Sequence, residues 1–379
     1  MEKERVNMII KNAKVYKENN TFEVQDIYIE NELITVKEAS NDEVIDATGL
    51  YAIPGLTDIH FHGCVGHDFC DGTQKAIEEI AKYQANNGVT TICPATMTLG
   101  EDTLLKIAKV AATYENKDGA ILTGINMEGP YVSVEKKGAQ NPAYIRKPDI
   151  EMYRRIQKES GDLIKLVAIA PEEEGAMEFI SELKDEVILS LAHTTADYDT
   201  AYEALSKGAN HITHLYNAMP PFSHREPGVV GAACDKPECM VELICDGIHI
   251  HPSVIRATFK MFGDDRIILI SDSMMATGMP DGEYSLGGQA VKVADHKATL
   301  VTDGAIAGSA TNLMDCMRNI VKNMGIPLET AVKCAAVNPA KSIGIYDKYG
   351  SIMPGKVANI VLLDKDLNIK SVILKGKEI

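Results

Sequence analysis

The chain has 379 residues, of which 45% are hydrophobic and 24% are charged, as in ordinary globular proteins and unlike disordered or fibrous chains. Its formal charge of -16 argues against a nucleic-acid partner, because proteins that bind phosphate backbones normally offer a basic face. The longest apolar runs are strand-sized, such as Ile267–Ile270, whereas a membrane helix needs about 20 apolar residues. We therefore expect no membrane span.

The N-terminal residues and the cysteines indicate which cellular compartment to expect. The first five residues are mostly charged, and no apolar segment of the signal type follows them. The eight cysteines are scattered without a Cys-x-x-Cys pair, and a chain of this length holds a core without disulfides. We expect a cytoplasmic protein with reduced, mainly structural thiols.

In chain order, the first predicted unit is a set of short strands. Residues 1–52 alternate between apolar and polar side chains, for instance at 8–15 and 26–34, and polar turns interrupt them. From residue 53 onward the pattern changes to eight apolar segments of strand type. These lie near 55–60, 89–94, 121–127, 164–170, 187–192, 210–214, 241–245 and 267–272.

Helical patterns lie between most of these eight segments. In residues 73–87, an apolar stripe includes Ala76, Ile77 and Ile80, and Gly88 can serve as the C-terminal cap. Similar patterns cover 101–115, 172–184, 197–207 and 252–261. Strand followed by helix, repeated eight times, is typical of a closed parallel barrel.

The last thirty or so residues again contain strands without helices, at 358–363 and 371–374. The sequence therefore predicts an α/β protein, a (β/α)8 TIM-like barrel with a small β-sandwich built from both chain ends. We place the sandwich at residues 1–52 and 345–379 and the barrel at residues 53–344.

Residues able to bind metal end five of the eight predicted strands. The first strand ends in His60 and His62, whose imidazoles point the same way because side chains alternate with period two. The third, fifth, sixth and eighth strands end in Glu128, His193, His214 and Asp272. In a parallel barrel these ends meet at one face, where functional groups project.

Each of these residues also has a simpler interpretation when taken alone. A single histidine is more often a hydrogen-bonding residue than a ligand, Glu128 before Gly-Pro could belong to a turn, and Asp272 could cap a helix. Five such strand ends together indicate a divalent-metal site, since nitrogen and oxygen ligands converge there. Zinc is our first candidate, and the same ligands also suit iron, manganese and cobalt.

Short motifs extend beyond these ligand positions. They are Pro-Gly-Leu-Thr-Asp-Ile-His-Phe-His-Gly (54–63), Glu-Gly-Pro (128–130), Ala-His-Thr (192–194), Thr-His-Leu-Tyr-Asn-Ala-Met (213–219), His-Arg-Glu-Pro-Gly (224–228), Asp-Gly-Ile-His (246–249) and Ser-Asp-Ser-Met (271–274). With these motifs, nearly the whole chain resembles the amidohydrolase superfamily and, within it, the N-acetylglucosamine-6-phosphate deacetylase family. His-x-His is common to the superfamily, whereas the motifs at 213–219 and 224–228 are narrow to the deacetylases.

The resemblance implies hydrolysis of the acetamide of N-acetylglucosamine 6-phosphate in amino-sugar catabolism and cell-wall sugar recycling. It implies one or two divalent metals per subunit, the first held by Glu128, His193 and His214, and a second at His60 and His62. The superfamily often bridges two metals with a modified lysine on the fourth strand. Here Lys165 lies only near the start of that strand, so we assign the bridge to Glu128.

The remaining expectations concern proton transfer and substrate. Asp272 is expected to act as general base and then general acid, with a plain metal ligand as the alternative. The resemblance implies that Arg225 and His249 hold the phosphate and that Arg225 reaches the site of the neighbouring subunit in a homodimer. A surface salt bridge with Glu226 is the alternative for Arg225. The expected sugar pocket comprises Ala139, Gln140, Asn217, Ala218, Ile306, Ala307 and Gly308, with Gln140 standing where other family members carry histidine.

Two other functions stay open at this point. One is another metal amidohydrolase, such as a dihydroorotase, a cyclic-amide hydrolase or an adenine deaminase, against which the His-Arg-Glu-Pro-Gly motif argues. The other is a non-catalytic scaffold that kept the barrel and lost its chemistry. Such a loss should erase ligands, but every expected ligand position is filled.

Overall fold

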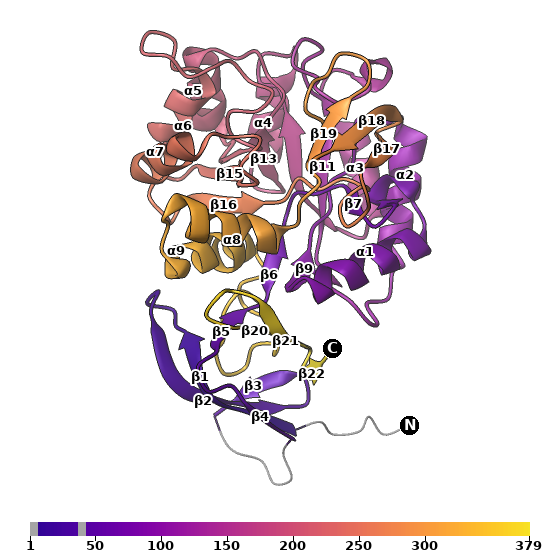
Figure 1. Ribbon diagram of the computed structural model, residues 1–379. Coiled ribbons are helices and arrows are strands. Elements are labelled where there is room, and N and C mark those ends of the chain that lie inside the picture. The colour runs from indigo at the N-terminus through magenta and orange to yellow at the C-terminus, as the bar shows by residue number, and fades with distance from the viewer. Residues whose placement is uncertain (1–6, 37–42) are drawn as a thin grey trace.

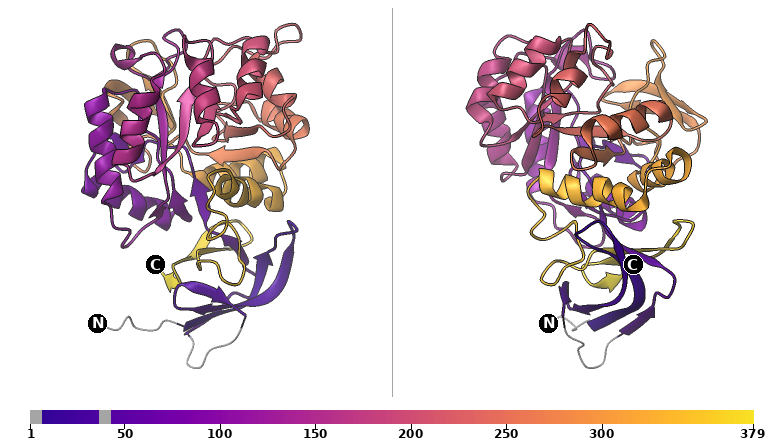
Figure 2. Two further views of the ribbon diagram at one scale, coloured as in Figure 1. Left: turned by 180° about the vertical axis from the view of Figure 1, so that it is seen from behind. Right: turned by 90° about the vertical axis from the view of Figure 1, so that its left-hand side faces the viewer.

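The computed structural model describes residues 7–36 and 43–379, and the charged N-terminal residues considered above lie outside this part of the chain. A barrel occupies one end of the molecule and a small β-domain the other, with the C-terminus in the β-domain (Figure 1). Two further views show the same division (Figure 2). No helix within the described ranges combines the length and the apolar character that crossing a membrane requires.

The barrel contains the eight predicted strand positions in the predicted order. Its strands are β6 (Leu56–Asp58), β9 (Val89–Ile92), β11 (Ile125–Tyr131) preceded by the short β10 (Ile121–Leu122), β12 (Ile164–Ile169), β13 (Ile188–Leu191), β14 (His211–Ile212), β15 (Met240–Ile244) and β16 (Ile267–Ile270). All neighbouring pairs are parallel. The ring closes where the Asp272 N–H donates to the His60 carbonyl at 2.9 Å, so the first and last strand ends lie side by side.

Helices surround the barrel and confirm the predicted strand–helix alternation. They are α1 (Gln74–Asn86), α2 (Glu101–Ala112), α3 (Ile150–Glu159), α4 (Ala176–Leu183), α5 (Tyr198–Lys207), α6 (Gly228–Cys234), α7 (Pro252–Phe262), α8 (Leu313–Met324), α9 (Leu328–Val332) and α10 (Asn338–Ser342), with a π-helical turn at Lys333–Val337 and 3₁₀ turns at Phe69–Asp71 and Pro142–Tyr144. The Thr73 hydroxyl caps α1 by accepting from the Ala76 N–H. At its other end the C-cap is Asn87 rather than the predicted Gly88, which follows with φ of 78°.

One small antiparallel sheet lies within the predicted barrel unit, residues 53–344, but its strands were not predicted. It consists of β17 (Gly282–Leu286), β18 (Gln289–Ala294) and β19 (Lys297–Leu300), inserted after the last barrel strand. Its buried side chains, among them Leu286, pack with Met97 and Met274. A second hairpin, β7 (Gly63–Cys64) with β8 (His67–Asp68), follows the first barrel strand. Both insertions lie at the end of the barrel where the predicted ligands meet.

The β-domain joins the two ends of the chain, as predicted. Its strands are β1 (Asn7–Tyr16), β2 (Phe22–Glu30), β3 (Leu33–Thr35), β4 (Glu43–Asp46), β5 (Tyr51–Pro54), β20 (Ile360–Leu363), β21 (Ile369–Leu374) and β22 (Lys377–Glu378). Antiparallel pairing of β5 with β20 connects the N-terminal and C-terminal strands, around a core of their own that includes Ile10, Ile29 and Leu362. The boundaries at residues 52 and 345 stay a prediction.

Candidate metal centre and substrate pocket

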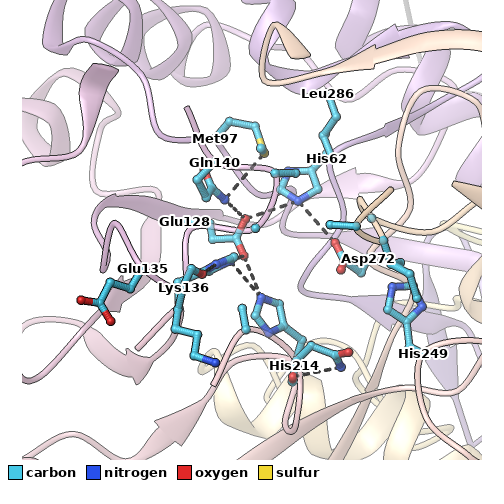
Figure 3. A pocket seen from close by; sticks show the side chains of 18 residues that line it. His62, Met97, Glu128, Glu135, Lys136, Gln140, His214, His249, Asp272 and Leu286 are labelled. Carbon is cyan, nitrogen blue, oxygen red and sulfur yellow. Dashed lines mark hydrogen bonds and ion pairs between the residues drawn. The ribbon is translucent and has the colours of Figure 1, made fainter. Parts of the chain in front are cut away.

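The barrel mouth brings together all six predicted ligands. His60 and His62 follow β6, Glu128 lies within β11, and the others follow three further strands. The side chains of His62 and His214 lie on either side of Glu128, and Asp272 faces Glu128 across the pocket (Figure 3). All six residues are at most 7% exposed. The structure therefore supports the geometric part of the prediction, while their roles as ligands stay predictions.

The first group consists of Glu128, His193 and His214. Nε2 of each histidine lies 3.1 Å from Glu128 Oε1, and the two Nε2 atoms are 3.2 Å apart. Tetrahedral zinc with nitrogen and oxygen ligands at about 2.0–2.1 Å separates those ligand atoms by about 3.3 Å. The triangle of ligand atoms thus has nearly the size that one divalent cation requires.

The second group shares Glu128 with the first. Nε2 of His60 lies 3.3 Å from Glu128 Oε1, and Nε2 of His62 lies 3.4 Å from Glu128 Oε2. Asp272 Oδ1 stands 3.4 Å from Nε2 of His62 and 3.9 Å from Nε2 of His60. In the described part of the chain, the buried Nε2 of His60 has no hydrogen-bond partner. The group therefore also fits a divalent cation.

Three of the strand ends adopt left-handed backbone conformations. The φ angles are 44° at His193, 28° at His214 and 48° at Asp272, a region that costs non-glycine residues of order 1–3 kcal/mol. Backbone hydrogen bonds hold these turns: the Ser133 N–H donates to the His193 carbonyl at 2.9 Å, and the Ser309 N–H donates to the Asp272 carbonyl at 2.6 Å. Strain held this firmly at converging polar side chains is typical of a functional site.

Electrostatics at the site favour positive charge between the carboxylates. Burial opposes a charge on His60, but the carboxylates of Glu242 and Glu128 outweigh it and raise its pKa well above the usual range. Burial likewise opposes ionisation of Glu128, yet His60 and the hydrogen bonds of the other histidines hold its pKa well below normal. Against the same burial, His62 lowers the pKa of Asp272. A bound cation would supply this positive charge directly.

Beside the ligands opens a cavity of about 400 Å³, within the size range of small-molecule sites. Twelve of the predicted site residues line it: His62, Glu128, Ala139, Gln140, His193, His214, Asn217, Ala218, His249, Asp272, Ile306 and Gly308. Three predicted residues do not. His60 lies beneath the cavity with no exposed surface, Ala307 packs with Leu286 in a separate apolar cluster, and Arg225 is exposed on the loop before α6.

Gln140 contacts a predicted metal ligand. Its side-chain Nε2 donates to Glu128 Oε2 at 2.7 Å, and its Oε1 accepts from the Thr98 N–H at 2.6 Å. The residue is 2% exposed. Since the Thr98 N–H fixes which end of the amide faces the carboxylate, Gln140 holds Glu128 in place, whether or not it also contacts the substrate.

His249 lines the cavity with its orientation fixed by Asp246. Asp246 Oδ2 accepts from His249 Nδ1 at 2.7 Å, and the two side chains are 5% and 6% exposed. Burial opposes a charge on His249, but Asp246 and the more distant Asp272 outweigh burial and Lys297, and its pKa is raised. His249 can therefore present a charged N–H to an anion in the cavity.

Sequence reasoning missed several residues of the site. Lys136 and Leu286 line the cavity, and Glu242 lies beneath it, accepting a hydrogen bond from His60. For Glu242 a signal was available, because a glutamate inside the apolar strand Met240–Ile244 calls for a buried partner. Lys136 and Leu286 belong to connecting segments, and nothing in their local sequence indicates that they reach the cavity.

Comparison with known proteins agrees with this geometry. The model of the amidohydrolase family matches residues 51–379. The chain is 37% identical to N-acetylglucosamine-6-phosphate deacetylase of Bacillus subtilis (strain 168), over 90% of this chain and 87% of that protein. It is 34% identical to N-acetylgalactosamine-6-phosphate deacetylase of Escherichia coli O157:H7, over 86% of each protein.

A solved structure extends the similarity to the whole fold. A mutant of N-acetyl-D-glucosamine-6-phosphate deacetylase from Mycobacterium smegmatis, in complex with N-acetyl-D-glucosamine-6-phosphate, has a TM-score of 0.91 at 31% identity. The match covers 98% of this chain and 99% of that one. The chain therefore belongs to the amidohydrolase family and, within it, to the N-acetylglucosamine-6-phosphate deacetylases.

Proposed function

We propose that the chain hydrolyses the acetamide of N-acetylglucosamine 6-phosphate, releasing acetate and glucosamine 6-phosphate in amino-sugar catabolism and cell-wall sugar recycling. The observation that carries this proposal is the triangle of Glu128, His193 and His214 beside a cavity large enough for a sugar phosphate. The Bacillus subtilis relative is named for this activity, and the M. smegmatis structure holds this substrate.

The proposed cofactor is one or two divalent cations per subunit, zinc first, with iron, manganese and cobalt as alternatives. Glu128, His193 and His214 would hold the first, and His60 with His62 the second. The carboxylates of Glu128, Asp272 and Glu242 are almost completely buried. Two groups of buried ligand atoms that share Glu128 each fit one divalent cation, which supports two cations.

Asp272 is the proposed proton carrier. A cation bound beside it would polarise the amide carbonyl and lower the pKa of the attacking water. The lowered pKa of Asp272, caused by His62 against the effect of burial, keeps its carboxylate ionised and able to accept the proton of that water. The same carboxyl group then donates this proton to the nitrogen that leaves as the free amine. The hydrogen bond from Gln140 to Glu128 and the backbone hydrogen bonds of Asp272 would keep these two carboxylates in position.

The phosphate would be held by His249 and by Arg225 of a neighbouring subunit. His249 lies in the cavity and is biased towards its charged form, as binding of a dianion requires. Arg225 is exposed and lines no part of the cavity of its own chain. A homodimer in which Arg225 reaches across the interface would bring it to the phosphate and bury it there.

Subunit mixing tests the shared site. A mixed dimer contains one Arg225→Ala chain and one Asp272→Asn chain. One of its two sites then combines the intact Asp272 of the first chain with the intact Arg225 of the second. Equal random mixing makes half of the dimers mixed, so about a quarter of wild-type activity should return at low substrate concentration. If the mixture stays at the average of the two parent variants, Arg225 does not act across an interface.

We also propose a cytoplasmic location. All eight cysteines are free thiols, as is usual in reducing compartments. Burial raises the pKa of the thiols of Cys64 and Cys93 above the usual range, so these thiols stay protonated and unreactive. A location in an oxidising compartment would instead favour pairing of cysteines in a secreted protein.

A substrate panel tests the proposed reaction. Acetate release should be measured with N-acetylglucosamine 6-phosphate, N-acetylgalactosamine 6-phosphate and unphosphorylated N-acetylglucosamine. The proposal predicts the highest kcat/KM for the first. N-acetylgalactosamine 6-phosphate, the C4 epimer of the first sugar, is the second candidate because the chain is 34% identical to an N-acetylgalactosamine-6-phosphate deacetylase. No acetate release from any of the three by metal-loaded protein would refute the proposal.

A further inference from the structure

Glu242 is a completely buried acid below the barrel mouth. It lies in the middle of β15 between apolar neighbours and has 0% exposed surface. It lines no part of the substrate cavity, so direct contact with the substrate does not explain it. A buried carboxylate is costly unless compensating groups surround it. Its presence therefore calls for a specific partner.

The partners of Glu242 are two of the predicted metal ligands. Its Oε2 lies 2.8 Å from Nδ1 of His60 and accepts from the backbone N–H of His214 at 3.1 Å. An ionised carboxylate can only accept hydrogen bonds, so Nδ1 of His60 carries the proton. When a cation takes the place of the second proton of His60, Nε2 offers its lone pair on the side of Glu128, whose Oε1 is 3.3 Å away.

A purely structural role does not account for these contacts. In the described part of the chain the other oxygen, Oε1, is buried without a hydrogen-bond partner. Nδ1 of His211 lies 3.9 Å from this oxygen and instead pairs with the Ser190 hydroxyl at 3.0 Å. A carboxylate satisfied on one oxygen only is a poor stabiliser of a core. A cation bound on the Nε2 side of His60 would offset the free-energy cost of burying the Glu242 carboxylate.

We propose that Glu242 is a positioning residue for the second metal: it fixes the tautomer and the orientation of His60 so that Nε2 binds the cation shared with His62 and Glu128. This rests on the metal site of the proposed function. A carboxylate behind a ligating histidine also makes that ligand more basic, and loss of such a partner typically weakens metal binding about 10- to 100-fold. Glu242 thus determines whether the His60–His62 pair binds a metal.

The test is a metal titration that needs no substrate. Metal-free protein is titrated with Co²⁺ or Zn²⁺ in a calorimeter, and the visible spectrum of the cobalt form reports each bound ion. Glu242→Gln keeps an oxygen acceptor for His60, removes the charge and replaces the other oxygen, which has no hydrogen-bond partner in the described part of the chain, by an amide NH2. We expect the first equivalent to bind as in the wild type and the second about 10- to 100-fold more weakly.

Two further variants separate positioning from general damage. Glu172→Gln makes the same chemical change at the same end of the barrel, where Glu172 accepts from the Thr195 N–H and has no contact with His60. It should leave both equivalents unchanged. His60→Asn should lose the second equivalent, and adding Glu242→Gln to it should weaken binding no further. A double variant that binds metal clearly more weakly than His60→Asn contradicts the proposal.

Other outcomes also decide the matter. The proposal is wrong if wild-type protein binds a single equivalent, or if Glu242→Gln weakens both equivalents alike or neither. Should Glu242→Gln fail to fold, Glu242→Asp keeps the charge but retracts it from His60, and it should weaken the second equivalent selectively; wild-type binding by this variant overturns the proposal. Because acetate release is measured separately, a protein with the wrong proposed substrate could still show the Glu242 effect.

Discussion

Replacement of Asp272 by asparagine tests the proposed proton carrier with little disturbance of the fold. Asparagine keeps the size of the side chain and tolerates the left-handed backbone at this position, where φ is 48°. The backbone hydrogen bonds to His60 and Ser309, at 2.9 and 2.6 Å, do not involve the side chain and should persist. The substitution therefore removes a basic site and little else.

The expected loss follows from the two proposed roles of Asp272, general base and then general acid. A general acid or base contributes about 10²- to 10⁴-fold, and a residue used in both half-reactions should lie at the upper end. We expect kcat to fall about 10³- to 10⁴-fold, which corresponds to about 4–5 kcal/mol of transition-state stabilisation. KM should change little. Stopped assays of acetate release, with enzyme at high concentration, can measure this range.

Metal content decides between the two interpretations of Asp272. Its Oδ1 lies 3.4 Å from Nε2 of His62, so it could also bind the second cation. If the variant loses metal in proportion to activity, Asp272 is mainly a ligand. If the variant keeps its metal and more than about a tenth of wild-type turnover, its loss of turnover is smaller than the smallest usual contribution of a general acid or base. The proton-carrier mechanism would then be wrong.

Three further predictions concern the substrate and the ligands. Arg225→Ala should raise KM about 10- to 100-fold for the phosphorylated sugar, as expected for a charged hydrogen bond of about 1.5–3 kcal/mol, and little for the unphosphorylated one; equal losses would assign Arg225 to folding or assembly. Because the pKa of His249 is raised, KM for the phosphorylated sugar should increase only above the usual imidazole range near about 6.5, and Asp246→Asn should move that increase to lower pH; an unmoved profile contradicts this. Gln140→Leu removes the donor to Glu128 and should weaken metal binding measured by titration, whereas unchanged binding would leave Gln140 as a substrate contact only.

The sequence was sufficient to predict the barrel and the convergence of its candidate ligands because both follow from strand patterns. Buried parallel strands are nearly continuous apolar runs, so a polar residue at the end of such a run stands out. His193, His214 and Asp272 all stand at such ends. A barrel then forces these ends to one face, which is why six residues spread over 213 positions could be placed together from sequence.

The rest depends on contacts whose partners lie far apart in the sequence. A glutamate inside the apolar strand Met240–Ile244 calls for a buried partner, but only the closed barrel shows that this partner is His60. The contact of Gln140 with Glu128 depends on the path of a long loop. Helix α8 could have been predicted, since Asn312 caps it and its buried residues recur at helical spacing. The proposed placement of Arg225 would depend on a second subunit, which the sequence of one chain does not position.

The most direct test of the account is acetate release by protein of known metal content. Protein stripped by a chelator, verified as metal-free by elemental analysis, should not hydrolyse N-acetylglucosamine 6-phosphate, and stoichiometric zinc, iron, manganese or cobalt should restore turnover. The ligand triangle of Glu128, His193 and His214 predicts this dependence. Full turnover by the verified metal-free protein would contradict the account.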